Sequence, residues 1–316
     1  MGCFWPLQIV SGRPHACGFY LMDPTGRRGP VQLKLPSLVH IMRDSFVCNG
    51  LICICTPIHN FIVRNAGIDE FSVLPLRPSA RSSVQLISKW AIGFGLVHNT
   101  NDFMVVGVTA EHNIFALTDK WCFTVDIYVQ GSSRWRSSFK PDQTLDDKLY
   151  LRLGKGEYAN GAYHWLVSFN PPRVMLCTPV CLLSFDIADE VLYWTSFPEV
   201  PGERHSWKLL KQKDSIAYIC RQLSCKEEGY SLWSRTGDCS NGSWIKKYAF
   251  KLSYGVRSHP VLFWKSSLLL MDSTGKILSL VDLHTGNIVK VFHLDNPCLA
   301  IQFSTRVFFQ LNHRCH

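Results

Sequence analysis

Two neighbouring segments indicate how this chain folds: residues 156–169 read GEYANGAYHWLVSF, and residues 181–198 read CLLSFDIADEVLYWTSFP. Asn160-Gly161 favours a sharp reversal, because both residue types tolerate a positive φ. The aromatic residues on either side of this pair predict two strands. In the second segment, the stretch 186–190 predicts another turn, and a returning strand that contains Trp194 follows it. We therefore expect two antiparallel strand pairs in succession.

Blurred copies of this unit recur along the chain. In each copy a strand leads into a polar turn, and an aromatic or apolar residue closes the unit. The closing residues are Phe71, Trp135, Trp194, Trp244 and Val289. The later copies recur at about 45–50 residues, which is a propeller-blade period. The sequence therefore predicts an all-β fold, a β-propeller-like repeat of four-stranded antiparallel sheets with about six blades, in a single domain over residues 1–316.

The end of the chain predicts how such a repeat is completed. Residues 299–311 resemble a strand with no partner of their own. We expect this strand to pair with N-terminal strands near residues 18–22 and so close the ring, since a propeller leaves only short protected edges.

Composition excludes several classes of protein. The chain has 316 residues, of which 47% are hydrophobic and 18% charged, as in a packed globular protein. Its net charge is +9, but the basic residues are dispersed, so neither a nucleic-acid nor a membrane partner is expected. The 13 cysteines are odd in number and several lie in apolar strands, which favours a reducing compartment. Without a signal peptide or a long apolar run, we expect a cytoplasmic or nuclear protein.

A search for catalytic motifs finds none: the chain has neither HExxH nor G-x-S-x-G. The cysteine spacings do not match a zinc site, and Cys53 and Cys55 are expected to lie in the core of a strand. We therefore predict no catalytic residue, no metal and no cofactor. His164 reads as a strand residue hydrogen-bonded to a neighbouring backbone group, with a general base as the alternative.

Carboxylates and tryptophans have two interpretations each. Asp126, Asp186 and Asp282 are expected at strand ends, where an Asp side chain caps a turn, although the same residues could form catalytic acid pairs. The tryptophans Trp135, Trp165, Trp194 and Trp244 could line a ligand cage. At repeat spacing, however, packing wedges between blades are the expected role, because each ring buries a large area.

Several segments, taken in order over residues 45–295, resemble the F-box associated domain (type 1) of plant F-box proteins. They include VCNGLIC at 47–53, FSVLP at 71–75, IGFG at 92–95, and the segments 156–165 and 183–190. The residues that carry the resemblance are Asn49, Gly50, Phe71, Gly93, Gly95, Trp135, Asn160, Gly161, Trp165, Asp186, Trp194, Trp244, Trp264 and Asp282.

The resemblance implies a non-catalytic recognition domain, like the substrate receptor of a Skp–cullin–F-box ubiquitin ligase, whose partner is an unidentified target protein. The F-box itself is expected to be missing, because residues 35–42 only echo its opening and 48–50 already belong to the β domain. Binding to a Skp adaptor or a cullin is therefore not expected. Two alternatives stay open: a carbohydrate-active or oxidase-type propeller enzyme, and a truncated gene product without independent function.

Overall fold

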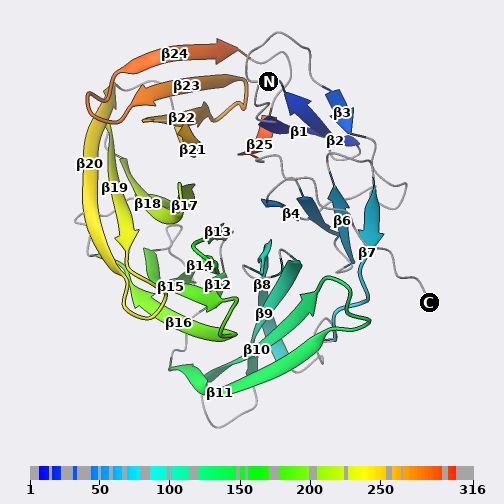
Figure 1. Ribbon diagram of the computed structural model, residues 1–316. Coiled ribbons are helices and arrows are strands. Elements are labelled where there is room, and N and C mark those ends of the chain that lie inside the picture. Colours follow the sequence, from blue (N-terminus) through cyan, green and yellow to red (C-terminus); the bar gives the residue numbers. More distant parts are fainter. Residues whose placement is uncertain are drawn as a thin grey trace. The chain divides into compact units, whose positions relative to one another are not determined.

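A computed structural model gives the fold of the chain as all-β, and the described strands pair antiparallel (Figure 1). The structure describes residues 7–13, 16–22, 31–33, 44–48, 51–56, 60–65, 70–78, 86–97, 100, 102–113, 120–146, 150–153, 156–170, 178–198, 205–223, 227–253, 258–264, 266–293 and 298–303. Within these ranges no helix is long and apolar enough to cross a membrane.

The chain divides into two compact units. Unit 1 comprises Met1–Leu76 with Gly255–His316, and unit 2 comprises Arg77–Tyr254. The assignment of residues 1–316 to a single domain therefore stays a prediction.

Unit 1 contains three sheets in its described residues, each of four strands, with the orders β25-β1-β2-β3, β4-β5-β6-β7 and β21-β22-β23-β24. The strands are β1 (Leu7–Arg13), β2 (Ala16–Met22), β3 (Val31–Leu33), β4 (Asp44–Cys48), β5 (Leu51–Cys55), β6 (Phe61–Asn65), β7 (Phe71–Val73), β21 (Ser258–Trp264), β22 (Ser267–Asp272), β23 (Ile277–Asp282), β24 (Ile288–His293) and β25 (Cys298–Phe303).

Unit 2 also contains three sheets in the part that the structure describes: β8–β11, β12–β16 and β17–β20. The strands are β8 (Leu86–Leu96), β9 (Phe103–Asn113), β10 (Lys120–Val129), β11 (Arg136–Asp146), β12 (Tyr150–Leu153), β13 (Glu157–Ala159), β14 (Ala162–Asn170), β15 (Thr178–Asp186), β16 (Val191–Ser196), β17 (His205–Gln212), β18 (Ser215–Leu223), β19 (Glu227–Thr236) and β20 (Ser243–Ser253).

The propeller-like repeat of four-stranded antiparallel sheets is confirmed. About six four-stranded blades were expected, and five sheets among the described residues have four strands. The remaining sheet has five, because β12 and β13 both pair with β14, one after the other along its length.

The two strand pairs predicted from residues 156–198 are present. Asn160 has φ 48° and Gly161 has φ 70°, and Ala159 pairs with Ala162 across this two-residue turn. Such left-handed backbone is what the Asn-Gly dipeptide supplies at little steric cost. β14 pairs with β15, and β15 pairs with β16, so the local turn chemistry leads directly to the observed sheet.

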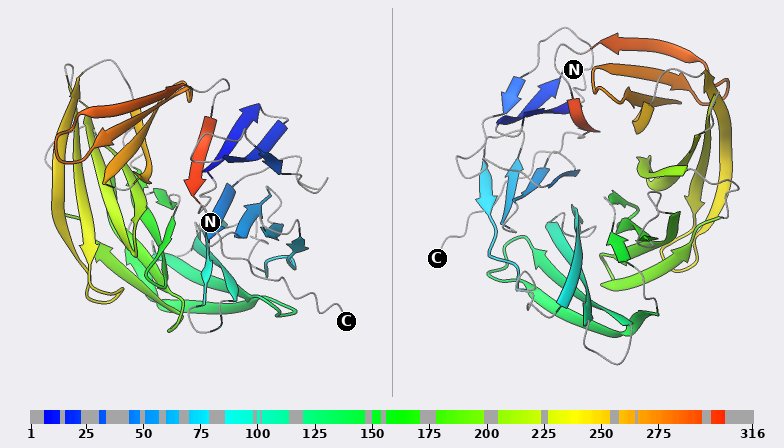
Figure 2. Two further views of the ribbon diagram at one scale, coloured as in Figure 1. Left: turned by 45° about the horizontal axis from the view of Figure 1, so that its top comes forward. Right: turned by 180° about the vertical axis from the view of Figure 1, so that it is seen from behind.

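The closing strand pairs with a different N-terminal strand from the one expected. β25 pairs antiparallel with β1, where Ile301 lies opposite Ile9 and Ala300 opposite Val10. The expected partner near residues 18–22 is β2, which pairs with the other edge of β1 (Figure 2). The predicted partner was wrong because β1 was not recognised as a strand. β1 ends in the polar stretch Ser-Gly-Arg, which is not typical of a strand.

Within unit 2, neighbouring sheets meet through aromatic side chains that lie on glycine backbone. The Trp165 ring nitrogen on β14 donates a hydrogen bond to the Ile92 carbonyl of β8, at 3.0 Å. A Cβ added to Gly93 would lie 2.6 Å from Cγ of Tyr163 and 3.0 Å from Cζ2 of Trp165. The absence of a side chain at this glycine therefore sets how closely the two sheets approach.

A second contact repeats this arrangement two residues further along β8. The Tyr158 hydroxyl donates to the Leu96 carbonyl at 2.9 Å, and a Cβ on Gly95 would lie 2.5 Å from the Tyr158 ring. The predicted positions Gly93 and Gly95 thus have a packing role in the structure.

We expect Gly93→Ala to destabilise the protein by about 1–3 kcal/mol, because the new methyl group overlaps two buried aromatic rings. Gly229→Ala on β19 is the matched control. There the nearest atom to an added Cβ is the flexible end of Gln222, at 3.4 Å, so the stability should change by less than about 0.5 kcal/mol. Urea unfolding followed by circular dichroism measures both, and equal stability of the two variants would contradict the packing role.

Candidate functional site

Two further tryptophans of unit 2 reach a neighbouring sheet. Trp194 on β16 packs edge to face against Phe123 of β10, with ring centroids 5.3 Å apart. The Trp244 ring nitrogen on β20 donates to the carbonyl of Ser196, the last residue of β16, at 3.1 Å. Together with Trp165, these rings bridge the three sheets in sequence order. Their place is structural, and no ligand cage forms from them in the described residues.

The other predicted aromatic positions behave differently. Trp135 is buried and packs 5.6 Å from Tyr128 of its own hairpin. Trp264, at the end of β21, packs against a cluster that includes Leu269. Phe71 on β7 is 43% exposed, so this closing residue does not fill a core position. Asn49 and Gly50 lie outside the described residues.

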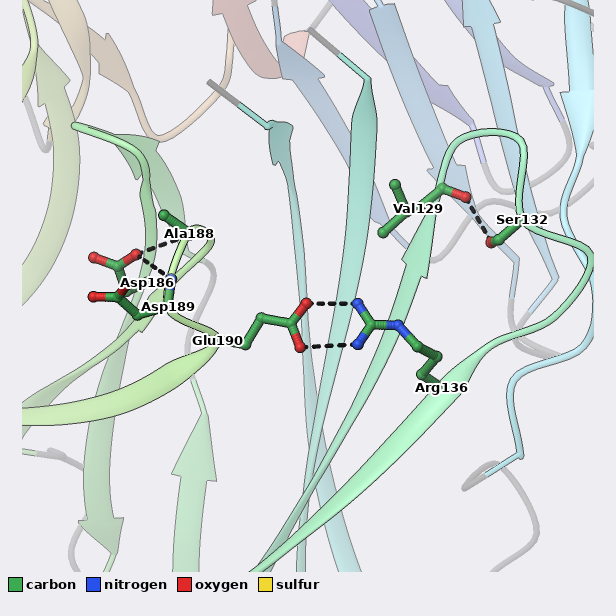
Figure 3. Close-up of polar contacts among 7 residues, drawn as sticks. All are labelled: Val129, Ser132, Arg136, Asp186, Ala188, Asp189 and Glu190. Atoms are coloured by element: carbon green, nitrogen blue, oxygen red, sulfur yellow. Dashed lines mark hydrogen bonds and ion pairs between the residues drawn. The ribbon is translucent and has the colours of Figure 1, made fainter. Parts of the chain in front are cut away.

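Asp186 and Asp282 cap the turns that follow their strands. The Asp186 carboxylate accepts hydrogen bonds from the backbone N–H groups of Ala188 and Asp189, at 2.9 and 3.2 Å (Figure 3). Asp282 accepts in the same way from Thr285, and this backbone N–H is the main cause of the lowered pKa of Asp282. The same pattern recurs at Asp238 and Asp272.

Asp126 has another role, and the expected capping position was wrong. Because β10 continues to Val129, Asp126 lies inside the strand, where it is completely buried. Its Oδ2 accepts from Arg77 Nε at 2.7 Å, and its Oδ1 accepts from Ser137 at 2.5 Å. Arg77 also donates to Thr109 and lies against Gly107, where an added Cβ would overlap the guanidinium. This carboxylate is one partner of a buried ion pair.

His164 is buried and both ring nitrogens have partners. Nε2 lies 3.3 Å from the Ala159 carbonyl and Nδ1 lies 2.8 Å from the Ser184 hydroxyl. Since a carbonyl only accepts, Nε2 carries the proton and Nδ1 accepts from Ser184. Burial, helped by the nearby charge of Arg235, lowers the pKa of His164 to about 3. The imidazole is therefore neutral at physiological pH, as a strand residue and not as a poised base.

An exposed ion pair joins the β8–β11 sheet to the turn between β15 and β16. The Arg136 guanidinium donates two hydrogen bonds to the Glu190 carboxylate, at 2.5 and 3.0 Å (Figure 3). Glu190 itself has φ 56° in the turn. The hydrogen bond to Glu190 raises the pKa of Arg136. At this exposure the pair contributes at most about 1 kcal/mol, so its main effect is to orient the turn.

Four turns of unit 2 lie at one end of their sheets. In an antiparallel sheet every second connection lies at the same end, so the β13–β14 turn at Asn160-Gly161 and the β15–β16 turn at Asp186–Glu190 lie together, and the Ile187 N–H donates to the Gly161 carbonyl at 3.1 Å. Turns at Lys213-Asp214 and at residues 237–242 do the same for β17–β20. A small cavity is lined by Asn160 and His164 from one sheet and by Ser215, Arg235 and Cys239 from the next. We call these four turns, with the cavity, the turn face of unit 2.

The turn face contains a buried thiol, and the described residues contain no metal-binding cluster. Burial raises the pKa of the Cys239 thiol to about 11, so this thiol is protonated and a poor nucleophile. Among the described residues, no group of three or more His, Cys, Asp or Glu side chains could hold a metal ion. The alternative of a propeller enzyme needed clustered carboxylates or metal ligands. In the structure Asp126 is in a buried ion pair, and Asp186 and Asp282 each cap their own turn.

Comparison with protein families decides what kind of domain this is. Residues 28–296 match the family model described as the F-box associated beta propeller domain. The chain belongs to this family. The matching model is type 3, whereas the sequence resemblance pointed to type 1. Members of the family are protein-interaction propellers. A search of curated proteins found no match.

Several solved structures align with this chain at low identity. Oligogalacturonate lyase in complex with manganese aligns with TM-score 0.48 and 10% identity over 89% of this chain and 71% of that one. Apo AztD from Citrobacter koseri aligns with TM-score 0.42 and 10% identity over 97% and 100% of the two chains. The N-terminal domain of Nup159 gives TM-score 0.39 and 7% identity over 84% and 70%.

Sequence reasoning missed the arginines that organise unit 2. Arg77 lies 49 residues from Asp126, and Arg136 lies 54 residues from Glu190. Isolated arginines in turns and strands carry no local pattern, so no signal in one sequence could have paired them. Arg235 on β19 was missed for the same reason.

We expect Asp126→Asn to destabilise the protein by roughly 3–5 kcal/mol, because the amide leaves the buried Arg77 without its negative partner. Replacing both partners, as in Arg77→Met with Asp126→Leu, should recover part of this loss. Asp189→Asn, at an exposed carboxylate, is the control and should change stability by less than about 0.5 kcal/mol. Urea unfolding tests the set; a loss in Asp126→Asn no larger than in the control would exclude the buried pair as a stabilising element.

His164 should make the protein acid-sensitive. The unfolded chain binds a proton on this histidine near pH 6.5, whereas the folded protein binds it only near pH 3. Between these values the unfolded state holds more protons, so stability falls as the pH falls, by at most about 1.4 kcal/mol per pH unit. His164→Gln should flatten this slope, while His284→Gln at an exposed turn is the control. Unfolding free energies from pH 7 to 4 measure it, and an unchanged slope in His164→Gln would refute the assignment.

Proposed function

We propose that this protein binds a target protein as the substrate-recognition domain of a Skp–cullin–F-box ubiquitin ligase. The observation that carries the proposal is the match to the F-box associated β-propeller family over residues 28–296. In such an assembly, ubiquitin transfer takes place on other subunits. A neutral His164 and a protonated Cys239 are compatible with a domain that binds and does not catalyse.

We further propose that the turn face of unit 2 is the surface that meets the target. Its turns are held by backbone bonds to Asp186 and Asp238 and by the Arg136–Glu190 pair, so little conformational entropy remains to be lost on binding. Exposed side chains at Asn160, Asp189 and Lys213 offer both charge signs and hydrogen-bonding groups. Rigid scaffolds commonly carry their binding residues on such turns.

The proposal does not assign contact with the Skp adaptor to the segment before β5. The described residues of this segment form the strands β1–β4 and not the helical F-box module. We propose that these residues complete β-sheets and make no adaptor contact.

The proposal is tested by capturing partners of the tagged chain in cells whose cullin ligases are inhibited, so that bound targets accumulate. Lys213→Glu on the turn face should reduce capture of the true target several-fold. Lys247→Glu, the same charge change on the exposed face of β20, should leave capture unchanged.

Ubiquitination is the second measurement. With the ligases active, the ubiquitinated fraction of the captured protein should fall when the chain is depleted. If every captured protein binds both variants equally, the turn face is not the binding surface. If capture is specific but ubiquitination does not respond, the domain recognises proteins outside a ubiquitin ligase.

A further inference from the structure

A small cavity opens on the turn face between the β12–β16 and β17–β20 sheets. Its volume is about 10 Å³, close to the smallest space that holds one water-sized group. Asn160 and Gly237 are exposed at its rim, whereas His164, Arg235 and Cys239 are buried in its wall.

Arg235 in this wall is buried without a carboxylate in direct contact, although the charge of the exposed Asp238 carboxylate acts on it from a distance. Its residue is 6% exposed. Nη2 donates to the Cys239 carbonyl at 3.0 Å and to the Thr195 hydroxyl at 3.3 Å, both neutral acceptors. Nε is buried and has no acceptor, and no carboxylate among the described residues lies within ion-pair distance of the guanidinium. Gly242 lies directly against the side chain, where a Cβ would be 2.5 Å from it, so the guanidinium is held in place.

The acidic groups near the Arg235 guanidinium either accept hydrogen bonds in their own turns or are neutral. The Asp186 carboxylate accepts backbone bonds in its own turn, and Asp238 does the same with Ser240 and Asn241. The Cys239 thiol stays protonated, because burial raises its pKa to about 11. A buried cation is costly unless it is paired and hydrogen-bonded, and Arg235 has an Nε without an acceptor and no carboxylate in contact among the described residues.

We propose that this cavity is a binding site for a small monovalent anion, a halide ion or one oxygen of a carboxylate, which pairs with Arg235. Asn160, exposed at the rim of the cavity, carries a side-chain amide that could donate a second hydrogen bond to such an anion. A carboxylate could come from free solution or from an acidic side chain of a bound target. The target as source rests on the function proposed above, whereas the anion site itself does not.

The experiment uses the purified full chain at constant ionic strength with sodium isethionate, a bulky anion, as the background salt. Chloride, acetate or N-acetyl-aspartate amide then replaces part of the isethionate while thermal unfolding is followed. Binding to the folded state alone raises the folding equilibrium constant with ligand concentration, about 100-fold when the ligand is at 100 times its Kd. Broadening of the ³⁵Cl NMR line, reversed by acetate, reports binding directly.

The three added anions distinguish a free halide ion from a carboxylate as the ligand. Stabilisation by acetate and by the aspartate derivative assigns the site to carboxylates, including a protein side chain. Stabilisation by chloride alone assigns it to a free halide ion. No concentration-dependent stabilisation and no line broadening in the wild-type chain would mean that the cavity holds water, and would overturn the proposal. None of these results depends on finding a target, so a failure of the proposed function would be seen separately.

Two variants locate the effect. Arg235→Gln should abolish the anion-specific stabilisation. Asn160→Asp places a negative charge at the exposed rim, at a position whose φ of 48° Asp tolerates, and should weaken anion binding at least tenfold even if Arg235→Gln does not fold. Asn287→Asp in the exposed turn after β23 is the charge-matched control and should bind as wild type does. An unchanged anion response in Asn160→Asp would place any bound anion elsewhere.

Discussion

Unit 2 depends on aromatic side chains of one sheet lying directly on the glycine backbone of the next. A sheet of four strands cannot cover its own two faces, so its stability comes from the sheet beside it. At the β8 strand, glycine lets the rings of Tyr163 and Trp165 approach the backbone, and the Trp165 ring nitrogen satisfies the Ile92 carbonyl. Burial and hydrogen bonding thus occur in one contact. This contact also fixes the position of β13 and β14, and with them the Asn160-Gly161 turn.

The two buried arginines show how differently a charge can be accommodated in the same unit. Arg77 has a carboxylate at 2.7 Å, a hydroxyl acceptor and a glycine that makes room for it, so it acts as an internal cross-link between strands. Arg235 is held as firmly, but its contacts are neutral and one of its nitrogens has no acceptor. The first arginine has a carboxylate in direct contact, whereas among the described residues the second has none. That difference separates a structural arginine from a candidate binding residue.

Local chemistry explains which parts of this structure could be predicted. The Asn160-Gly161 turn and the capping role of Asp186 depend on residues two or three positions apart, so the sequence contains all the information they need. The Arg77–Asp126 pair and the β1–β25 pairing depend on segments far apart, and nothing local distinguishes them. Asp126 looked like Asp186 in sequence, yet one is inside a strand and the other ends one. The error arose because Asp126 was assigned to a strand end, whereas its strand continues to Val129.

The same reasoning explains why the scaffold was easier to predict than the site. Each hairpin of a repeat needs a tight turn, so the same turn residues recur along the chain and form a visible sequence pattern. The cavity at Arg235 forms once, where two copies of the pattern meet, and it draws on residues from both sheets. A recognition site in a repeat protein is therefore expected where the repeat is broken by an unusual residue at a junction. A buried cation beside an exposed turn is such a departure, and it can serve recognition because the regular contacts around it already hold the fold together.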